Sequence, residues 1–99
     1  MDNYYTMIGV DNYYYDKQHL DAINQLKNRN IHAYILDTGE YALIKIPESE
    51  IPKLPIDQKY NDFYLPTTDT SGRSLYTDKE FDSIEEGWIS INDYVEVMQ

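Results

Sequence analysis

The first 46 residues contain the feature that most constrains the fold, because strand-like and helix-like runs follow one another there in the order strand, helix, strand, strand. β-branched and aromatic residues fill the strand-like runs, which are Tyr4 to Val10, Ile31 to Leu36 and Tyr41 to Ile46. Between the last two runs, Asp37-Thr38-Gly39-Glu40 has the composition of a hairpin turn. The handedness of crossover connections then predicts that the first two strands are parallel and that the third is antiparallel to the second.

The helix of this unit is predicted from the spacing of its apolar residues. Leu20, Ile23 and Leu26 recur every third position, which puts one narrow apolar stripe on a helix. Asp16 is placed to cap its first turn. The helix is expected to end near residues 28–30, because the Asn residues there tolerate the left-handed backbone of a helix exit.

After residue 46 the sequence predicts an irregular proline-rich loop. Prolines remove backbone donors from any ladder, and four of them fall within twenty residues: Pro47, Pro52, Pro55 and Pro66. Two apolar groups are expected to hold this loop against the core. They are Ile51, Leu54 and Ile56, followed by Tyr60, Phe63, Tyr64 and Leu65.

The last quarter of the chain predicts a short acidic helix and one or two strands. Thr77 precedes Glu80 by three positions, which is the capping-box spacing, so a helix is expected from Asp78 to Glu86 with Gly87 as its stop. Trp88 to Ile91 then indicates a strand, while residues 93–98 fit either a strand or a helix.

The fold class expected from these patterns is α+β, in a single domain of 99 residues. Its parts are a β-α-β-β unit at 1–46 with a mixed sheet and one packed helix, a proline-rich and polar connection at 47–74, and an acidic segment at 75–99. Cysteine is absent, the first residues lack the pattern of a signal peptide, and no apolar run reaches membrane-spanning length. We therefore expect a cytoplasmic protein without a membrane partner.

Charge is the strongest functional signal. The formal net charge is −10, and residues 57–99 hold ten acids against three bases. From residue 78 onward Lys79 is the only base, and the acids are Asp78, Glu80, Asp82, Glu85, Glu86, Asp93 and Glu96. Such a chain lacks the basic groove that supplies most nucleic-acid affinity, which argues against direct nucleic-acid binding.

The acids predict a different role. On the expected helix, Asp78, Asp82 and Glu85 or Glu86 would form a row of carboxylates about one turn (~5.4 Å) apart. Phosphates on a DNA strand are spaced on a similar order, ~3.4 Å in axial projection. Such a row can therefore imitate a nucleic-acid backbone toward a protein that binds one, such as a nuclease.

Aromatic residues supply candidate anchors for that interface, namely Tyr13, Tyr14, Tyr15 and Trp88. In size and charge the chain resembles anti-defence proteins of phages and mobile elements, such as anti-CRISPR and anti-restriction factors. This resemblance implies an inhibitor that acts by binding, with no catalytic residue, cofactor or metal. The alternatives are that the acids only solubilise the protein, or that it is an interaction module whose contacts lie on the proline-rich loop or an exposed strand edge.

One motif suggests an enzyme. Asp37-Thr38-Gly39, preceded by Ile35-Leu36, resembles the catalytic triplet of retroviral-type aspartic proteases, and Gly72-Arg73 resembles a segment near that family's end. The resemblance implies a homodimer in which two Asp37 carboxylates share a proton. An aspartate-led hairpin turn explains the same residues, and we favour the turn.

The β-α-β-β opening also resembles the first half of SPOR-type peptidoglycan-binding domains. The residues that carry this resemblance are Tyr4, Tyr5, Ile8 and Gly9 in the first strand and Tyr41 at the start of the third. It implies the same opening fold and a glycan ligand. The two histidines, His19 and His32, have no second nitrogen or sulfur donor near them in sequence, so no metal site is expected.

Overall fold

The order strand, helix, strand, strand is confirmed in a computed structural model that describes residues 2–9, 18–67 and 72–94. The elements of this half are β1 (Asn3–Gly9), α1 (Gln18–Asn28), β2 (Tyr34–Asp37) and β3 (Tyr41–Pro47). Those of the second half are the 3-10 helix η1 (Glu48–Lys53), β4 (Ile56–Asp57), β5 (Asp62–Leu65), β6 (Arg73–Ser74), α2 (Lys79–Asp82) and β7 (Ile89–Ser90). The predicted cap of α1, Asp16, lies outside the described residues.

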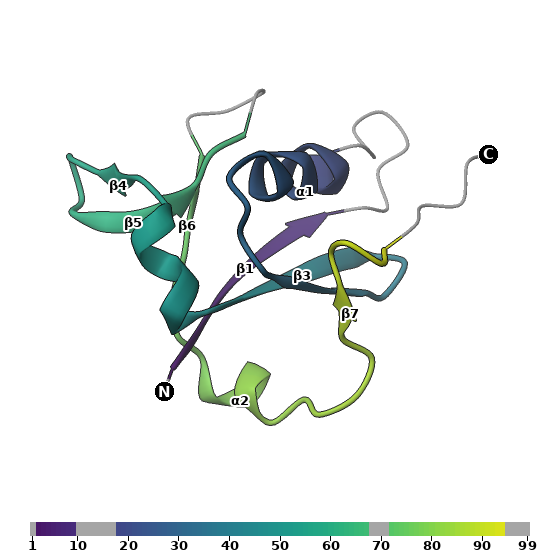
Figure 1. The fold of residues 1–99 in the computed structure, drawn as a ribbon. Helices are drawn as coiled ribbons and strands as arrows, with labels where there is room; N and C mark the ends of the chain where they lie inside the picture. Colours follow the sequence, from purple (N-terminus) through teal and green to yellow (C-terminus); the bar gives the residue numbers. More distant parts are fainter. Residues whose placement is uncertain (1, 10–17, 68–71, 95–99) are drawn as a thin grey trace.

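The main sheet has the strand order β1-β3-β2-β7. β3 lies between β1 and β2 and is antiparallel to both, so β1 and β2 run parallel to each other, as predicted. β7 adds an antiparallel edge beside β2. Helix α1 covers one face of this sheet, and α2 lies on the opposite side (Figure 1).

Both predicted breaks in the opening half have the expected geometry. Asn30 has a φ of 57°, and the N–H of Ile31 donates to the Leu26 carbonyl at 3.0 Å, which ends α1 in a left-handed exit. In the turn between β2 and β3, Gly39 has a φ of 91° and its N–H donates to the Asp37 carboxylate at 2.9 Å. A short aspartate side chain and a glycine therefore close this hairpin.

The prediction of an irregular proline-rich loop is wrong. Residues 47–66 contain η1, β4 and β5, and a second small sheet has the order β4-β5-β6. Pro52 fits inside η1 because that element is one short 3-10 segment, and a proline removes little from a helix with so few internal bonds.

The two apolar groups predicted to hold this region are only partly correct. Ile51, Leu54 and Leu65 are buried. Ile56 and Tyr60 are 47% and 61% exposed, because the β4–β5 hairpin that carries them projects from the body of the molecule (Figure 1).

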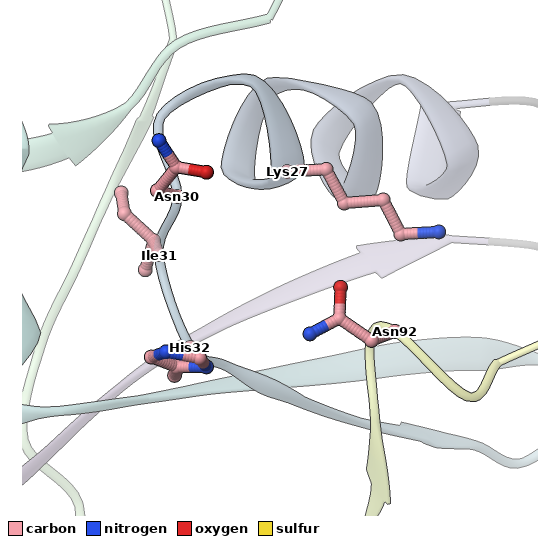
Figure 2. Close-up of a pocket in the computed structure, with 5 residues that line it drawn as sticks. All are labelled: Lys27, Asn30, Ile31, His32 and Asn92. Atoms are coloured by element: carbon pink, nitrogen blue, oxygen red, sulfur yellow. The ribbon is translucent and has the colours of Figure 1, made fainter.

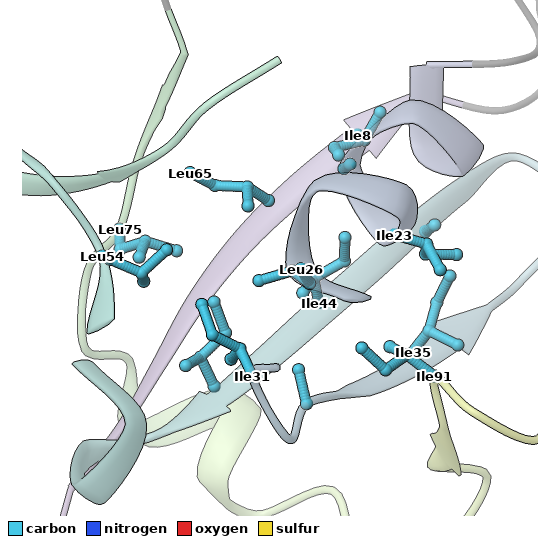
Figure 3. Close-up of a cluster of buried hydrophobic side chains, with 14 of the residues drawn as sticks. Ile8, Ile23, Leu26, Ile31, Ile35, Ile44, Leu54, Leu65, Leu75 and Ile91 are labelled. Carbon is cyan, nitrogen blue, oxygen red and sulfur yellow. The ribbon is translucent and has the colours of Figure 1, made fainter. Parts of the chain in front are cut away.

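The core lies between α1 and the main sheet (Figure 3). Alternate residues of the strands face it, and the apolar stripe of α1 packs on them. The strands contribute Ile8, Ile35, Ala42, Ile44 and Ile46, and the helix contributes Ala22, Ile23 and Leu26. Each fully buried Ile or Leu contributes about 1.5–3 kcal/mol through removal of its surface from water.

The other face of the sheet is also covered. Tyr5 and Leu43 are only 1% exposed although they point away from α1, as the alternation of β1 and β3 requires. Because α2 lies on that side (Figure 1), the C-terminal part of the chain is the segment that covers them.

Candidate protein-binding surface

The segment Tyr76–Ser90, here called the acidic strap, crosses the face of the sheet that α1 leaves open. At its start, Tyr76 forms a two-bond bridge with the outer edge of β1: the Tyr5 N–H donates to the Tyr76 carbonyl at 2.7 Å, and the Tyr76 N–H donates back at 3.1 Å. At its end, β7 pairs with β2. The strap is thus held at both edges of the sheet.

The helix in the strap differs from the predicted one. It spans Lys79–Asp82 and is capped by the carboxylate of Asp78, which accepts from the N–H of Glu80 at 2.8 Å and of Phe81 at 3.4 Å. The predicted cap, Thr77, is therefore wrong by one residue.

The predicted length of this helix is wrong as well, because it ends well before Glu86. The hydroxyl of Ser83 donates to the Glu80 carbonyl at 2.6 Å and closes the final turn. Glu85 and Glu86 lie beyond this end. A row of carboxylates at helical spacing, as expected from the sequence, is consequently not formed.

Aromatic contacts hold the strap to the sheet. The Tyr5 ring lies edge-on to Phe81 with centroids 5.4 Å apart, and 6.1 Å from the Trp88 ring. The indole N–H of Trp88 donates to the Ile84 carbonyl at 2.9 Å, and the Tyr5 hydroxyl donates to the Asp82 carboxylate. A segment with one short helix thereby has a defined path.

Lys45 lies beneath this aromatic group. The register of the sheet puts Tyr5, Lys45 and Tyr34 side by side on three strands. The Lys45 ammonium is 4.4 Å from the Trp88 ring centroid and 5.1 Å from that of Tyr34, which are cation–π distances. Burial lowers the pKa of Lys45, and the charge of Asp82 partly opposes that shift.

The same environment raises the pKa of two tyrosine hydroxyls on this face. Burial, followed by the hydrogen bond to Asp82, raises the pKa of Tyr5. Burial raises the pKa of Tyr76 too, with the charge of Asp78 as a further cause. Both phenols therefore stay protonated at neutral pH and can act as donors.

The carboxylates of the strap point to solvent. Glu80, Asp82, Glu85 and Glu86 are exposed, while Asp78 is partly buried by its capping role. Within residues 2–9, 18–67 and 72–94, none of these five acids forms an ion pair with a Lys or Arg. Five acids and Lys79 give the strap a formal charge of −4 that no neighbouring base in these ranges neutralises by contact.

The structure brings together only part of the predicted site. Asp78, Glu80, Asp82, Glu85, Glu86 and Trp88 all lie in the strap. Asp93 is exposed on the turn after β7, outside the strap. Tyr13, Tyr14, Tyr15 and Glu96 lie outside the described residues.

Sequence reasoning missed the residues beneath the strap, namely Tyr5, Tyr34, Lys45, Tyr76 and Phe81. One signal was available. Tyr5, Tyr34 and Lys45 occupy strand positions that alternate with the aliphatic core residues, so the strand assignment could have placed these side chains on the second face.

The Asp37 carboxylate is engaged within its own hairpin. One oxygen accepts from the Gly39 N–H at 2.9 Å, and the other accepts from the Tyr94 hydroxyl at 2.7 Å. Among the described residues, no group of three or more His, Asp or Glu is placed to hold a metal ion.

Comparison with protein-family models, curated proteins and solved structures finds no match to this chain. None of the helices in the described ranges is both long enough and apolar enough to cross a membrane.

Proposed function

We propose that this chain is a non-enzymatic binding protein whose acidic strap occupies the basic nucleic-acid site of another protein. The observation that carries the proposal is that the strap exposes Glu80, Asp82, Glu85 and Glu86 while no Lys or Arg of the described residues pairs with them. Unpaired carboxylates are available to the Lys and Arg side chains of a partner, with which they form charge-assisted hydrogen bonds.

The attachment of the strap supports this function in a second way. Charges on a flexible tail lose conformational entropy when they bind, whereas charges on a positioned segment lose less. Tyr5 and Trp88 hold the strap on a rigid sheet, so the carboxylates have defined positions before a partner arrives. The exposed part of Tyr34 and the half-buried Trp88 add aromatic surface beside the acids.

The short length of α2 determines the type of mimicry that we propose. The acids are spread along a short helix and an irregular segment instead of one helical row. The strap therefore imitates a nucleic acid through local charge density, not through regular phosphate spacing, and its partner is a basic cleft that tolerates variation in the path of the backbone.

A matched pair of variants tests this proposal. Glu80→Gln/Glu85→Gln/Glu86→Gln removes three charges from the strap, and Glu40→Gln/Glu48→Gln/Asp62→Asn removes three exposed charges elsewhere. Asp82 is left unchanged because its carboxylate accepts a hydrogen bond from the Tyr5 hydroxyl. The three chains are used to capture partners from lysate of the source cells, and captured proteins are challenged with duplex DNA.

We expect the unmodified chain to capture a nucleic-acid-binding protein that duplex DNA displaces. The strap variant should associate with this protein about tenfold more slowly, and the control variant should associate at the unchanged rate. Affinity should also fall steeply between low and high salt. Capture that survives in the strap variant, or that DNA cannot displace, refutes the proposal.

A second candidate function has one specific observation in its favour. Ile56 and Tyr60 are 47% and 61% exposed on the projecting β4–β5 hairpin, which fits an interaction module that binds through an apolar contact. Ile56→Ser/Tyr60→Ser should abolish capture in that case, and salt should have little effect.

A further inference from the structure

A small polar cavity lies on the helix side of the molecule, away from the acidic strap. It has a volume of about 110 Å³ and is lined by Lys27, Asn30, Ile31, His32 and Asn92. These residues come from the end of α1, from the loop that enters β2 and from the turn that follows β7 (Figure 2). Three separate segments of the chain therefore form one opening.

The walls of this cavity are fixed by hydrogen bonds of the main chain. The Ile91 N–H donates to the Ala33 carbonyl at 3.0 Å, which joins the turn after β7 to the loop before β2. On the outer side, the His32 N–H donates to the Glu50 carboxylate at 2.6 Å and the Lys53 ammonium donates to the Asn30 carbonyl at 3.0 Å. Ile31, which also lines the cavity, is buried.

The side chains around the opening are hydrogen-bond donors without partners. In the described part of the chain, the side chains of Lys27, Asn30, His32 and Asn92 form no hydrogen bond or ion pair. Figure 2 shows Lys27 extending from α1, with Asn92 between it and His32 in this view. An ammonium, an imidazole and two amides therefore belong to residues that line one cavity, and none of the lining residues is acidic.

The negative groups at the end of α1 and at Glu50 are already engaged. A helix C-terminus carries partial negative charge, which opposes an anion. Here, however, the last carbonyls of α1 accept bonds from the chain itself: Leu26 from Ile31 at 3.0 Å and Lys27 from Asn30 at 3.1 Å. Glu50, whose pKa is lowered first by the His32 N–H, also accepts from Lys53 at 3.1 Å.

We propose that this cavity binds a phosphate group. A volume of about 110 Å³ corresponds to roughly three or four water molecules at ~30 Å³ each, which suits one small oxoanion. It is well below the ~300 Å³ of the smallest drug-sized pockets. The lining lysine can bind phosphate as a point charge. This site is independent of the acidic strap.

The test is an NMR titration of the ¹⁵N-labelled chain with inorganic phosphate in a zwitterionic buffer, with sodium chloride at equal ionic strength as the reference. Saturable shifts are expected at the amides of Asn30, His32 and Asn92. Acetate, titrated in the same way, should bind at least fivefold more weakly.

Two variants locate the site. Lys27→Gln and Asn92→Ala should each weaken phosphate binding at least threefold while the rest of the spectrum is unchanged, because both side chains are exposed and make no internal bond. Lys59→Gln removes an exposed lysine from the β4–β5 hairpin and should leave the affinity unaltered. Shifts that do not saturate, that chloride reproduces, or that survive Lys27→Gln overturn the proposal, and so does acetate binding as tightly as phosphate.

Discussion

The two faces of the main sheet are covered by different chemistry. On the α1 face, aliphatic side chains such as Ile8, Ile44 and Leu26 meet in a continuous core. On the strap face, the buried contacts involve Tyr5, Lys45 and Trp88, and they include a hydrogen bond to a carboxylate and a cation over a ring. Aliphatic packing tolerates many arrangements, whereas hydrogen bonds and ring contacts require particular ones. The first face therefore supplies stability, and the second fixes the position of charged groups.

The largest effect is expected on the α1 face. Leu26→Ala should lower the free energy of unfolding by about 2–5 kcal/mol, because the Leu26 side chain is fully buried and its removal leaves a cavity under α1. Leu36→Ala makes the same change under the strap, where the side chain is partly buried, and should cost clearly less. Urea unfolding measures both, and equal losses would remove the distinction between the faces.

Substitutions at two glycines with similar backbone conformations test how closely the strap packs on the sheet. Gly87 and Gly39 have φ values of 96° and 91°, so an alanine at either is strained by about 1–2 kcal/mol. A Cβ at Gly87 would also lie 2.6 Å from a methyl of Leu36, while one at Gly39 meets nothing within 4 Å. Gly87→Ala should thus cost about 0.5–1.5 kcal/mol more than Gly39→Ala in thermal unfolding, since Leu36 must change rotamer. Equal losses of stability in the two variants would show that Gly87 does not pack closely against Leu36.

The hydrogen bond from Tyr5 to Asp82 should contribute about 1 kcal/mol, less than a buried bond to a charged group because Asp82 is exposed. Tyr5→Phe removes it without removing the ring. Hydrogen exchange of the Phe81 to Ser83 amides should accelerate by the factor that corresponds to about 1 kcal/mol, and a double-mutant cycle with Asp82→Ala should give a coupling energy of about 1 kcal/mol. A coupling near zero would show that ring packing alone holds α2.

Glu50, at the edge of the α1 face, should make the stability of the fold depend on pH. Its pKa is lowered in the folded protein, first by the His32 N–H and then by Lys53. The unfolded state therefore binds more protons in the acidic range, so this stabilisation is complete above the unfolded pKa of about 4.3 and is lost as pH falls through the folded pKa. Glu50→Gln should therefore lower the stability at pH 7 and have no effect near pH 2. A loss that persists at low pH would assign the effect to packing.

The smallest effect is expected from the strap charges. Glu80→Gln/Glu85→Gln/Glu86→Gln should change stability by less than about 0.5 kcal/mol, because these side chains are exposed and unpaired with described bases. Any change should be a slight gain at low salt, since repulsion between like charges is removed. A marked loss would mean that the acids support the fold instead of a partner.

The sequence predicted the features that depend on neighbouring residues. The β-α-β-β order, the left-handed exit at Asn30 and the Gly39 turn each follow from a local pattern, and all are observed. Residues 47–66 were misinterpreted because strands of two to four residues are too short to show a period, and the prolines were the stronger local signal.

The candidate site was predicted in composition but not in form. Thr77 and Asp78 are both good capping residues, and sequence alone does not decide between neighbours. The contact between Lys45 and Trp88 depends on the register of β3 with β2 and of β2 with β7. Such registers join positions far apart in the chain, which a local pattern does not encode.

The bridge between Tyr5 and Tyr76 has a consequence for biosynthesis. Tyr5 is synthesised well before Tyr76, so its outer edge stays unpaired until Tyr76 follows, and during that interval Leu43 and the Tyr5 ring are uncovered. A nascent chain halted before Tyr76 therefore presents a bare apolar surface to chaperones and proteases. Synthesis of the acidic strap then shields that surface.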